Sequence, residues 1–177
     1  SYGIKKDYIA VLPGKSTGYC KVTLENGHPC YELVRDVAYD EIPKLPINRS
    51  FDAIYYGTLA QRDQRSAGTL DYILSSVSHK QAFFDINIRQ NFYTPETIER
   101  SLKHATIFKL SREESFVFGE YASLEELCRI LYSKYSNLNI IIVTLDADGA
   151  MVYSCAEDNF YYSRKPRAVV VSTVGAG

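Results

Sequence analysis

Four short polar segments in this chain each follow an apolar stretch, and each carries residues that could bind a phosphate or a hydroxyl group. In the first, Asp85, Asn87 and Arg89 stand at alternate positions after the apolar residues 82–84. On an extended chain these three side chains lie on one side, where an acid, an amide and a guanidinium suit hydroxyl and phosphate recognition. Taken alone, the pattern fits a structural salt bridge at least as well.

The other three polar segments lie further along the chain. In the second, Glu114 could lie beside the cation Lys109, although the acidic first turn of a helix would show the same pattern. The third, residues 144–149, joins two apolar stretches. The fourth, residues 173–177, ends in Gly-Ala-Gly, whose free backbone N–H groups suit an anion, as would the start of a following helix.

The elements that must position these segments alternate from residue 50 onward. Compact apolar runs predict strands, and apolar residues at helical spacing predict helices between them. The predicted strands are 50–56, 82–85, 106–110 and 139–145, and the predicted helices are 64–78, 94–105 and 123–135. Thr94 and Ser123 stand where helix N-caps are expected, the second as part of a capping box with Glu126. This order predicts a three-layer α/β fold, with a mainly parallel sheet, helices on both faces and ligands at the carboxyl ends of its strands.

A hairpin precedes this alternating region. Residues 19–24 and 30–35 flank Asn26-Gly27, a strong turn signal, and predict two antiparallel strands that could close over the site as a flap. Further strands are predicted at 7–12, 150–154 and 159–163.

The composition is that of an ordinary globular domain and argues against several kinds of partner. The 177 residues are 46% hydrophobic and 23% charged, with a net charge of -1. A surface without excess positive charge argues against a nucleic-acid partner. No apolar run is long enough to predict a membrane span. The four cysteines match no metal motif, and we expect reduced, core-type thiols in a cytoplasmic protein.

Two motif-like segments are better explained without a ligand. Residues 14–17 (Gly-Lys-Ser-Thr) look like the end of a phosphate-binding P-loop, but Ile9 stands where that motif needs a glycine, and a strand follows instead of a helix. Asp146 and Asp148 look like the start of a calcium loop, but the later ligands of such a loop are missing, so we interpret this segment as a hairpin turn.

Together the four polar segments resemble the ribokinase-like (PfkB) carbohydrate kinases, and within them the bacterial fructokinases. The family patterns Asp-x-Asn-x-Arg, Lys-Leu-Asn-x-x-Glu, Thr-x-Gly-x-x-Gly and Asp-Thr-x-Gly-Ala-Gly-Asp match them in order, over nearly the whole chain. Residues 57–62 resemble the fructokinase stretch Gly-Ser-Leu-Ala-x-Arg, and residues 16–35 resemble its lid hairpin. The chain departs from the family patterns at Ser111, Asp146 and Ser172.

The resemblance implies transfer of a phosphoryl group from ATP, with Mg²⁺, to a sugar hydroxyl, fructose being the first candidate. The implied catalytic groups are Arg89 and the amides of an anion hole formed by Gly175, Ala176 and Gly177. The implied nucleotide and phosphate contacts are Lys109, Ser111, Glu114, Thr144, Gly149 and Thr173, with Glu114 also organising the magnesium ion. The implied sugar-binding residues are Asp85, Asn87 and Arg62. The lid would close over the sugar and exclude water.

We expect residues 1–177 to be a central part of such a kinase domain, with the lid at 16–35 and the α/β core at 50–177. The family's N-terminal Gly-Gly segment and its catalytic aspartate after Gly-Ala-Gly are not in this sequence, so we expect the chain alone to be inactive. Two alternatives remain open. One is a family member that has lost catalysis and binds a sugar or nucleotide, and the other is a nucleoside kinase of the same fold. The lid is also a candidate surface for a homodimer.

Overall fold

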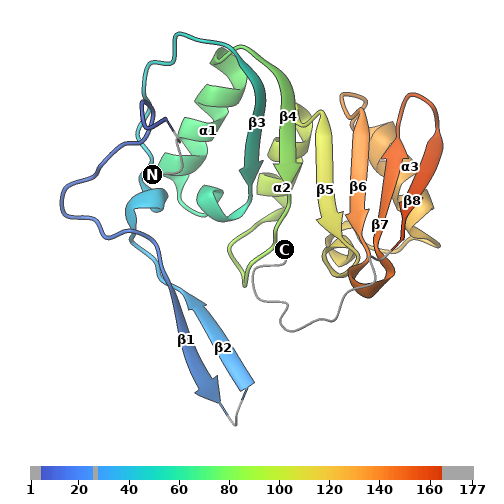
Figure 1. Ribbon diagram of the computed structural model, residues 1–177, viewed down its shortest axis with the longest axis horizontal. Helices are drawn as coiled ribbons and strands as arrows, with labels where there is room; N and C mark the ends of the chain where they lie inside the picture. The colour runs from blue at the N-terminus through green and yellow to red at the C-terminus, as the bar shows by residue number, and fades with distance from the viewer. Residues whose placement is uncertain (1–4, 26–27, 165–177) are drawn as a thin grey trace.

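The computed structural model describes residues 5–25 and 28–164, and its main body is a six-stranded sheet in the order β3-β4-β5-β6-β7-β8 (Figure 1). β3 to β6 are parallel, whereas β7 and β8 are antiparallel to their neighbours. The strands are Phe51–Gly57 (β3), His79–Asp85 (β4), Ile107–Ser111 (β5), Ile140–Thr144 (β6), Ala150–Ser154 (β7) and Asn159–Ser163 (β8). The mainly parallel sheet predicted from residue 50 onward is confirmed.

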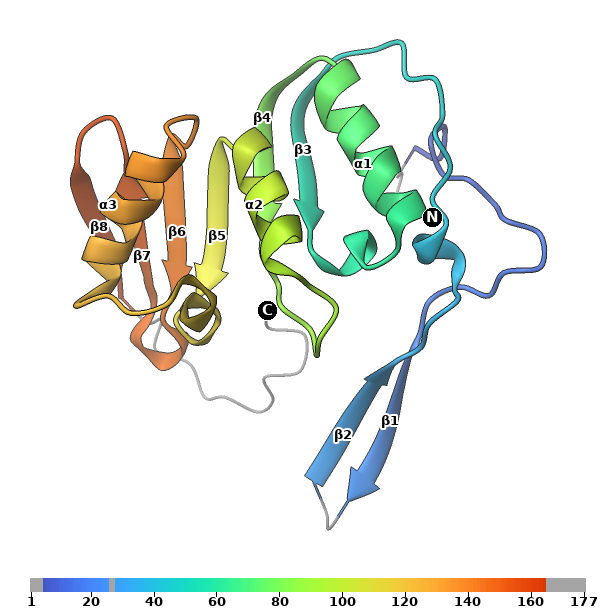
Figure 2. The same cartoon turned by 180° about the vertical axis from the view of Figure 1, so that it is seen from behind.

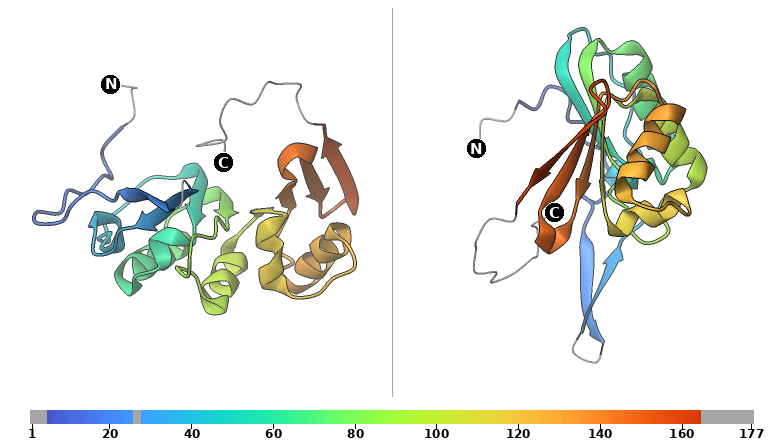
Figure 3. Two further views of the ribbon diagram at one scale, coloured as in Figure 1. Left: turned by 90° about the horizontal axis from the view of Figure 1, so that it is seen from below. Right: turned by 90° about the vertical axis from the view of Figure 1, so that its right-hand side faces the viewer.

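Three α-helices connect the parallel strands: α1 (Gln64–Ser76), α2 (Pro95–His104) and α3 (Leu124–Lys134). In the part of the chain that the structure describes, all three cover the same face of the sheet (Figures 2 and 3), whereas the alternation of elements in the sequence predicts helices on both faces. The strand order explains the difference. Each new strand lies on the same side of the previous one, so right-handed crossovers place every connecting helix on one face.

The helix starts agree with the capping signals in the sequence. The side chain of Thr94 accepts a hydrogen bond from the amide of Thr97, and the side chain of Ser123 accepts one from the amide of Glu126. Asp63 caps α1 in the same way by accepting from the amide of Arg65. Each cap satisfies an amide that the first helical turn leaves without a partner, and this fixes where the loop before the helix ends.

An aromatic row crosses the helix-covered face of the sheet. Tyr56, Phe84 and Phe108 stand opposite one another on β3, β4 and β5, with adjacent ring centroids 5.3 Å and 5.4 Å apart. Phe84 and Phe108 are fully buried, as is Leu102 of α2. Burying a side chain of this kind contributes about 1.5–3 kcal/mol. This core therefore holds the carboxyl ends of the three strands in a fixed register.

The predicted hairpin is confirmed as β1 (Cys20–Glu25) paired with β2 (His28–Leu33), and it projects away from the sheet (Figures 1 and 2). Val22 stands opposite Tyr31, and both are more than half exposed. Lys21 stands opposite Glu32 on the other face and forms a 3.9 Å ion pair with it. A two-stranded ribbon is marginally stable alone, so its base must be supported by the core. We call β1 and β2 the lid.

The strand predicted at residues 7–12 is wrong: this segment forms turns and extended chain without strand pairing. A strand needs a neighbour for its backbone hydrogen bonds, and the order of the sheet gives this segment none among the described residues. Short 3₁₀ helices occupy Ala38–Asp40 (η1), Leu59–Gln61 (η2), Glu113–Phe118 (η3) and Asp146–Asp148 (η4). Over the described residues, every helix is too short or too polar to cross a membrane.

Candidate active site

The carboxyl ends of β3, β4 and β5 bring a tyrosine, an acid and a lysine together. Asp85 stands opposite Lys109, whose Nζ lies 3.1 Å from Oδ1 and 3.0 Å from Oδ2 of the carboxylate. The hydroxyl of Tyr55 donates a 2.8 Å hydrogen bond to Oδ2. Partial desolvation and this hydrogen bond raise the pKa of Tyr55 to about 12, so the hydroxyl remains a donor at neutral pH. Asp85 therefore forms an ion pair, the alternative left open for its segment, but its partner is Lys109 of β5; the expectation that Glu114 lies beside Lys109 is wrong, because Asp85 occupies that place.

Glu114 ties the ends of β4 and β5 together. Its Oε1 accepts a 2.7 Å hydrogen bond from the amide of Ile88, and its Oε2 accepts a 2.8 Å hydrogen bond from the amide of Ser111. The Ser111 hydroxyl in turn accepts from the amide of Glu114, at 3.1 Å. A carboxylate has about four lone-pair sites. Glu114 therefore keeps acceptor capacity after holding two backbone amides, and it is fixed in place by them.

Asn87 and Arg89 follow β4, but they do not continue its extended geometry. Asn87 has a φ of 41° and Gln90 a φ of 50°, both in the left-handed region. The prediction that Asp85, Asn87 and Arg89 lie on one side of an extended chain is therefore wrong in its geometry. Arg89 is exposed, and no ion pair of its side chain is found within the described residues. Backbone strain of this kind persists where surrounding contacts enforce it.

The segment after β4 is held close to β3. The hydroxyl of Thr58 donates a 2.7 Å hydrogen bond to the backbone oxygen of Ile86. A Cβ on Gly57 would lie 2.8 Å from the backbone oxygen of Asp85, closer than real Cβ contacts come, so this position needs glycine. These contacts aim the segment that carries Asn87 across the end of β3.

A cavity of about 220 Å³ opens at these strand ends. Its lining residues are Tyr39, Tyr55, Gly57, Leu59, Ala60, Asp85 and Asn87. Two of the three residues expected to bind sugar, Asp85 and Asn87, line it. Its combination of apolar walls with a phenol, an amide and a carboxylate is typical of small-molecule sites.

The end of β6 lies beside this group. Thr144 stands opposite Ser111 of β5, and its backbone oxygen accepts a 2.9 Å hydrogen bond from the amide of Arg112. η4 and Gly149, at a φ of 101°, then turn the chain into β7, as the hairpin interpretation predicted. Asp148 forms an exposed ion pair with Arg112 at 2.9 Å. The described residues contain no cluster of three metal-ligating side chains.

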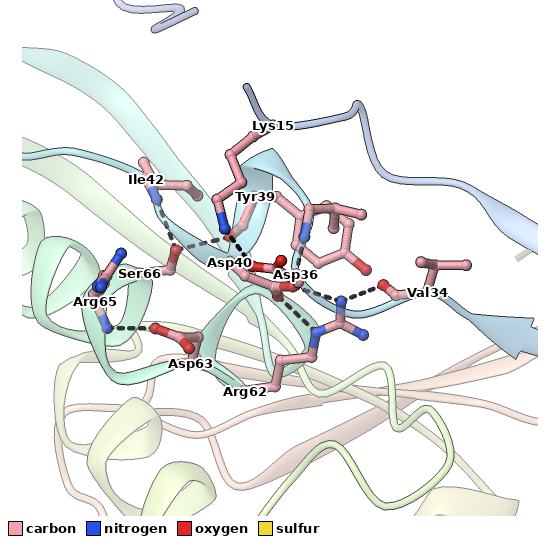
Figure 4. Close-up of polar contacts among 11 residues, drawn as sticks. Lys15, Val34, Asp36, Tyr39, Asp40, Ile42, Arg62, Asp63, Arg65 and Ser66 are labelled. Atoms are coloured by element: carbon pink, nitrogen blue, oxygen red, sulfur yellow. Dashed lines mark hydrogen bonds and ion pairs between the residues drawn. The ribbon is translucent and has the colours of Figure 1, made fainter. Parts of the chain in front are cut away.

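Arg62 lies elsewhere, at the base of the lid (Figure 4). Its Nε and Nη2 donate to the two carboxylate oxygens of Asp40 at 2.7 Å and 2.8 Å, and Nη2 also donates to the backbone oxygen of Val34 at 2.6 Å. The Arg62 side chain is 2% exposed. Burial acts to raise the pKa of Asp40, but the hydrogen bonds from Arg62 and from the amide of Val37 outweigh it and hold the pKa below its usual value. Arg62 does not line the strand-end cavity.

Residues 14–17, which look like the end of a P-loop, do not form a phosphate-binding loop in the structure. Lys15 forms ion pairs with Asp36 and, at 2.6 Å, with Glu41, and no helix follows it. Cys128 and Cys155 are buried as expected for core thiols, and burial raises the pKa of the Cys128 thiol to about 12, but the expectation is wrong for Cys20, which is exposed on the lid ribbon. The predicted anion hole at residues 173–177 lies outside the described residues.

Sequence reasoning missed Tyr55, Asp40 and Phe92. Tyr55 could have been found, because it lies two residues before Gly57 and so shares a strand face with the end of β3. Asp40 and Phe92 carry no such local signal. Their roles come from contacts with Arg62, a residue more than twenty positions away from each.

The fold is that of known sugar and nucleoside kinases. Aminoimidazole riboside kinase from Salmonella enterica, complexed with aminoimidazole riboside and an ATP analog, is 25% identical to this chain with a TM-score of 0.69. The match covers 83% of this chain and 51% of the riboside kinase chain. Fructokinase from Vibrio cholerae O395, with fructose, ADP and calcium ion bound, is 20% identical with a TM-score of 0.72. The match covers 93% of this chain and 56% of the fructokinase chain. An uncharacterized sugar kinase from Pyrococcus horikoshii in complex with ATP is 20% identical with a TM-score of 0.61. The match covers 93% of this chain and 54% of the sugar kinase chain.

This chain thus spans about half the length of the solved structures that it matches. No curated protein is similar enough in sequence to be matched. The family model for pfkB family carbohydrate kinases matches residues 1–177, in agreement with the four polar segments and with the sheet that carries three of them. The chain belongs to the pfkB family of carbohydrate kinases.

Proposed function

We propose that the protein containing this chain transfers the terminal phosphoryl group of ATP to a hydroxyl group of a sugar. The observation that carries this proposal is the group at the ends of β4 and β5. There, Glu114 bridges the two strand ends beside the Asp85–Lys109 pair, and a small cavity opens next to them. Open α/β sheets bind their ligands at such carboxyl ends.

The residues present fit a magnesium ion and the phosphates of ATP. Mg²⁺ is usually held in proteins by one or two carboxylates and by substrate phosphates while it keeps several waters, and Glu114 offers a fixed carboxylate with free acceptor capacity. Mg²⁺ would neutralise charge on the phosphates. The proposed contacts to the nucleotide phosphates come from neighbouring parts of the sheet: Lys109 and Ser111 of β5, Thr144 at the end of β6, and Gly149 just before β7.

Arg89 would bind the phosphoryl group in transfer. Its exposed guanidinium has no carboxylate partner among the described residues, so its charge is available to a ligand. The amides of Gly175, Ala176 and Gly177, with Thr173 beside them, would provide the anion hole, and the family's aspartate after that segment would take the proton of the sugar hydroxyl.

Fructose is the first candidate sugar, because residues 57–62 and the lid sequence resemble those of fructokinases. In the cavity, the Tyr55 hydroxyl would either donate to a sugar hydroxyl or keep Asp85 oriented so that its carboxylate accepts from one. The side-chain amide of Asn87 can donate and accept hydrogen bonds. A riboside is the second candidate. The specific observation in its favour is the similarity to aminoimidazole riboside kinase, which at 25% identity exceeds the 20% identity to fructokinase.

A second copy of the chain is the proposed partner of the lid. The cross-strand register places Cys20, Val22, Tyr31 and Leu33 on one ribbon face, and Val22 and Tyr31 are 55% and 52% exposed. Two such faces could cover each other in a two-fold dimer. Sedimentation of the full-length protein tests this: we expect a dimer that Val22→Lys converts to monomer, and a monomeric wild type would refute it.

The substrate proposal is tested by measuring kcat/KM of the full-length protein with ATP on fructose, ribose and aminoimidazole riboside. We expect fructose to be preferred by at least ~10-fold, which corresponds to about 1.4 kcal/mol of differential transition-state binding. A preference for the riboside would replace fructose as the substrate while leaving the kinase proposal intact. Absence of turnover on all three would contradict both sugar assignments.

A further inference from the structure

Four side chains form a stack at the base of the lid. The guanidinium carbon of Arg62 lies 4.8 Å from the ring centroid of Tyr39 and 4.6 Å from that of Phe92. The guanidinium carbon of Arg35 lies 4.5 Å from the centroid of the same Phe92 ring. A cation over an aromatic face is attracted electrostatically, and more strongly where water is excluded. The almost fully buried Arg62 meets that condition.

The members of the stack come from three parts of the chain. Arg35 and Tyr39 belong to the segment that leaves the lid after β2. Arg62 lies in the core between η2 and α1. Phe92 belongs to the segment after β4, which also carries Asn87 and Arg89. The lid, the core and the candidate phosphate-binding segment therefore meet at one buried guanidinium.

Hydrogen bonds join the same three parts. Arg62 holds the carboxylate of Asp40 and the backbone oxygen of Val34, both in the segment that leaves the lid. The side-chain amide of Gln90 donates a 2.7 Å hydrogen bond to the backbone oxygen of Tyr31 in β2. The segment after β4 thus contacts the lid directly as well as through Phe92.

The two chain segments at the lid base are hydrogen-bonded to each other. The amide of Val34 donates to the backbone oxygen of Tyr19 at 3.4 Å, and the amide of Ala38 donates to that of Ser16 at 2.8 Å. These two amides report on whether the base is closed. They lie next to the contacts of Arg62, so a weaker contact there would expose them to solvent more often.

We propose that Arg62 is a positioning residue that sets the angle of the lid against the candidate site and does not bind the sugar. The inference rests on the proposed function, because the lid would exclude water from the phosphoryl group. A planar guanidinium that makes two parallel hydrogen bonds to Asp40 and stacks on two rings fixes an angle as well as a distance, which a lysine cannot do. Arg62→Lys keeps the charge and removes that geometry.

A loosened lid admits water as the competing acceptor. The water oxygen then bonds to the γ-phosphorus, the bond from that phosphorus to the bridging oxygen breaks, and ADP, inorganic phosphate and a proton leave without phosphorylated sugar. The ratio of phosphorylated sugar to ADP therefore measures lid closure. A change in sugar affinity alone would not alter this ratio.

The experiment compares wild type, Arg62→Lys and Arg129→Lys in the full-length protein. Arg129 is a control with the same kinds of contact, since it pairs with Asp158 at 2.8 Å and lies 4.9 Å from the Phe160 ring, but it is exposed on α3 and away from the lid. Two readouts are taken: hydrogen exchange at the amides of Val34 and Ala38, and phosphorylated sugar formed per ADP released. Phe92→Leu, which removes part of the stack and keeps the ion pair, serves if Arg62→Lys does not fold.

In Arg62→Lys we expect exchange at the two amides to rise by at least ~10-fold, equal to about 1.4 kcal/mol of local opening. We also expect phosphorylated sugar per ADP to fall well below one, with Phe92→Leu changing both readouts in the same direction and Arg129→Lys changing neither.

Unchanged exchange with a raised sugar KM and an unchanged ratio would overturn the proposal and make Arg62 a sugar contact. Equal changes in Arg129→Lys would also overturn it. A wild type that phosphorylates no sugar refutes the proposed function, and the exchange readout then decides the role of Arg62 alone.

Discussion

The lid base and the strand-end site both contain an arginine, acids and aromatic rings, but they use their charges differently. At the lid base, Arg62 and Asp40 are almost fully buried and pair through two hydrogen bonds, while Nη1 of Arg62 is buried without a hydrogen-bond partner among the described residues. At the strand ends, Arg89 is exposed, and Glu114 keeps acceptor capacity after holding two amides. The comparison indicates that a buried charge paired with an opposite charge of its own chain serves structure, whereas an exposed charge or a fixed carboxylate with spare acceptor capacity at the strand ends is available to a ligand.

Asp40→Asn should produce the largest effect of the series, a decrease in the free energy of unfolding. Removing one partner of a buried ion pair leaves the other charge uncompensated and costs about 3–5 kcal/mol. Urea unfolding of the variant checks this, with Asp158→Asn as the control because the Arg129–Asp158 pair is exposed. An equally small change in both variants would remove the distinction between buried and exposed pairs.

The same ion pair predicts the acid dependence of stability. The pKa of Asp40 is below its usual value in the folded protein, so its contribution to stability is complete above the unfolded pKa of about 4 and is lost as pH falls through the folded pKa. Asp40→Asn should flatten that part of a stability–pH curve. An unchanged slope would show that Asp40 does not titrate as the structure indicates.

Arg89→Ala should have the opposite signature, a large loss of turnover with little change in melting temperature. Removing one preorganised donor to a charged transition state lowers kcat by about 10²–10³-fold, while an exposed side chain without an ion pair contributes little to folding. Steady-state kinetics and thermal melts of the same preparation check this. Full activity with a lower melting temperature would make Arg89 a structural residue.

Glu114→Gln should raise the Mg²⁺ concentration needed for half-maximal activity without abolishing activity. Altering a group that orients a metal's surroundings lowers metal affinity by about 10–100-fold. Activity is titrated with Mg²⁺ for wild type and variant, with Glu113→Gln as the neighbouring control. An unchanged half-saturating Mg²⁺ concentration would remove the proposed role of Glu114.

Tyr55→Phe should give the smallest effect of the series. It removes one hydrogen bond to Asp85 and one donor to a sugar hydroxyl, and a neutral hydrogen bond such as the second contributes about 0.5–1.5 kcal/mol. We therefore expect a rise of a few-fold in the KM for sugar with kcat nearly unchanged. A large fall in kcat would instead place Tyr55 among the groups that act on the transferred phosphate.

Local sequence signals predicted most of the fold, because strands, helices and caps are determined within a few residues. The Asn-Gly turn predicted the lid, and Thr94 and Ser123 predicted two helix starts. The errors are non-local. The strand expected at 7–12 lacks a neighbour among the described residues, and the faces covered by helices follow from strand order, which periodicity does not report.

The candidate site shows the same division. The family patterns selected Asp85, Lys109 and Glu114, which the structure brings together at two strand ends. Alternation failed beyond Asp85 because Glu114, more than twenty residues later, holds the amide of Ile88 and the chain turns at Asn87. The partner of Arg62 was unpredictable for the same reason, since Asp40 reaches it only through the folded lid base.

Product analysis of the wild-type, full-length protein tests the central claim most directly. The protein is incubated with ATP, Mg²⁺ and fructose, and ADP and phosphorylated fructose are quantified together by mass spectrometry. The account predicts that both form in equal amounts and that neither accumulates without the enzyme. Saturable binding of ATP and fructose without phosphorylated fructose would contradict it and favour a family member that binds these ligands without transferring phosphate.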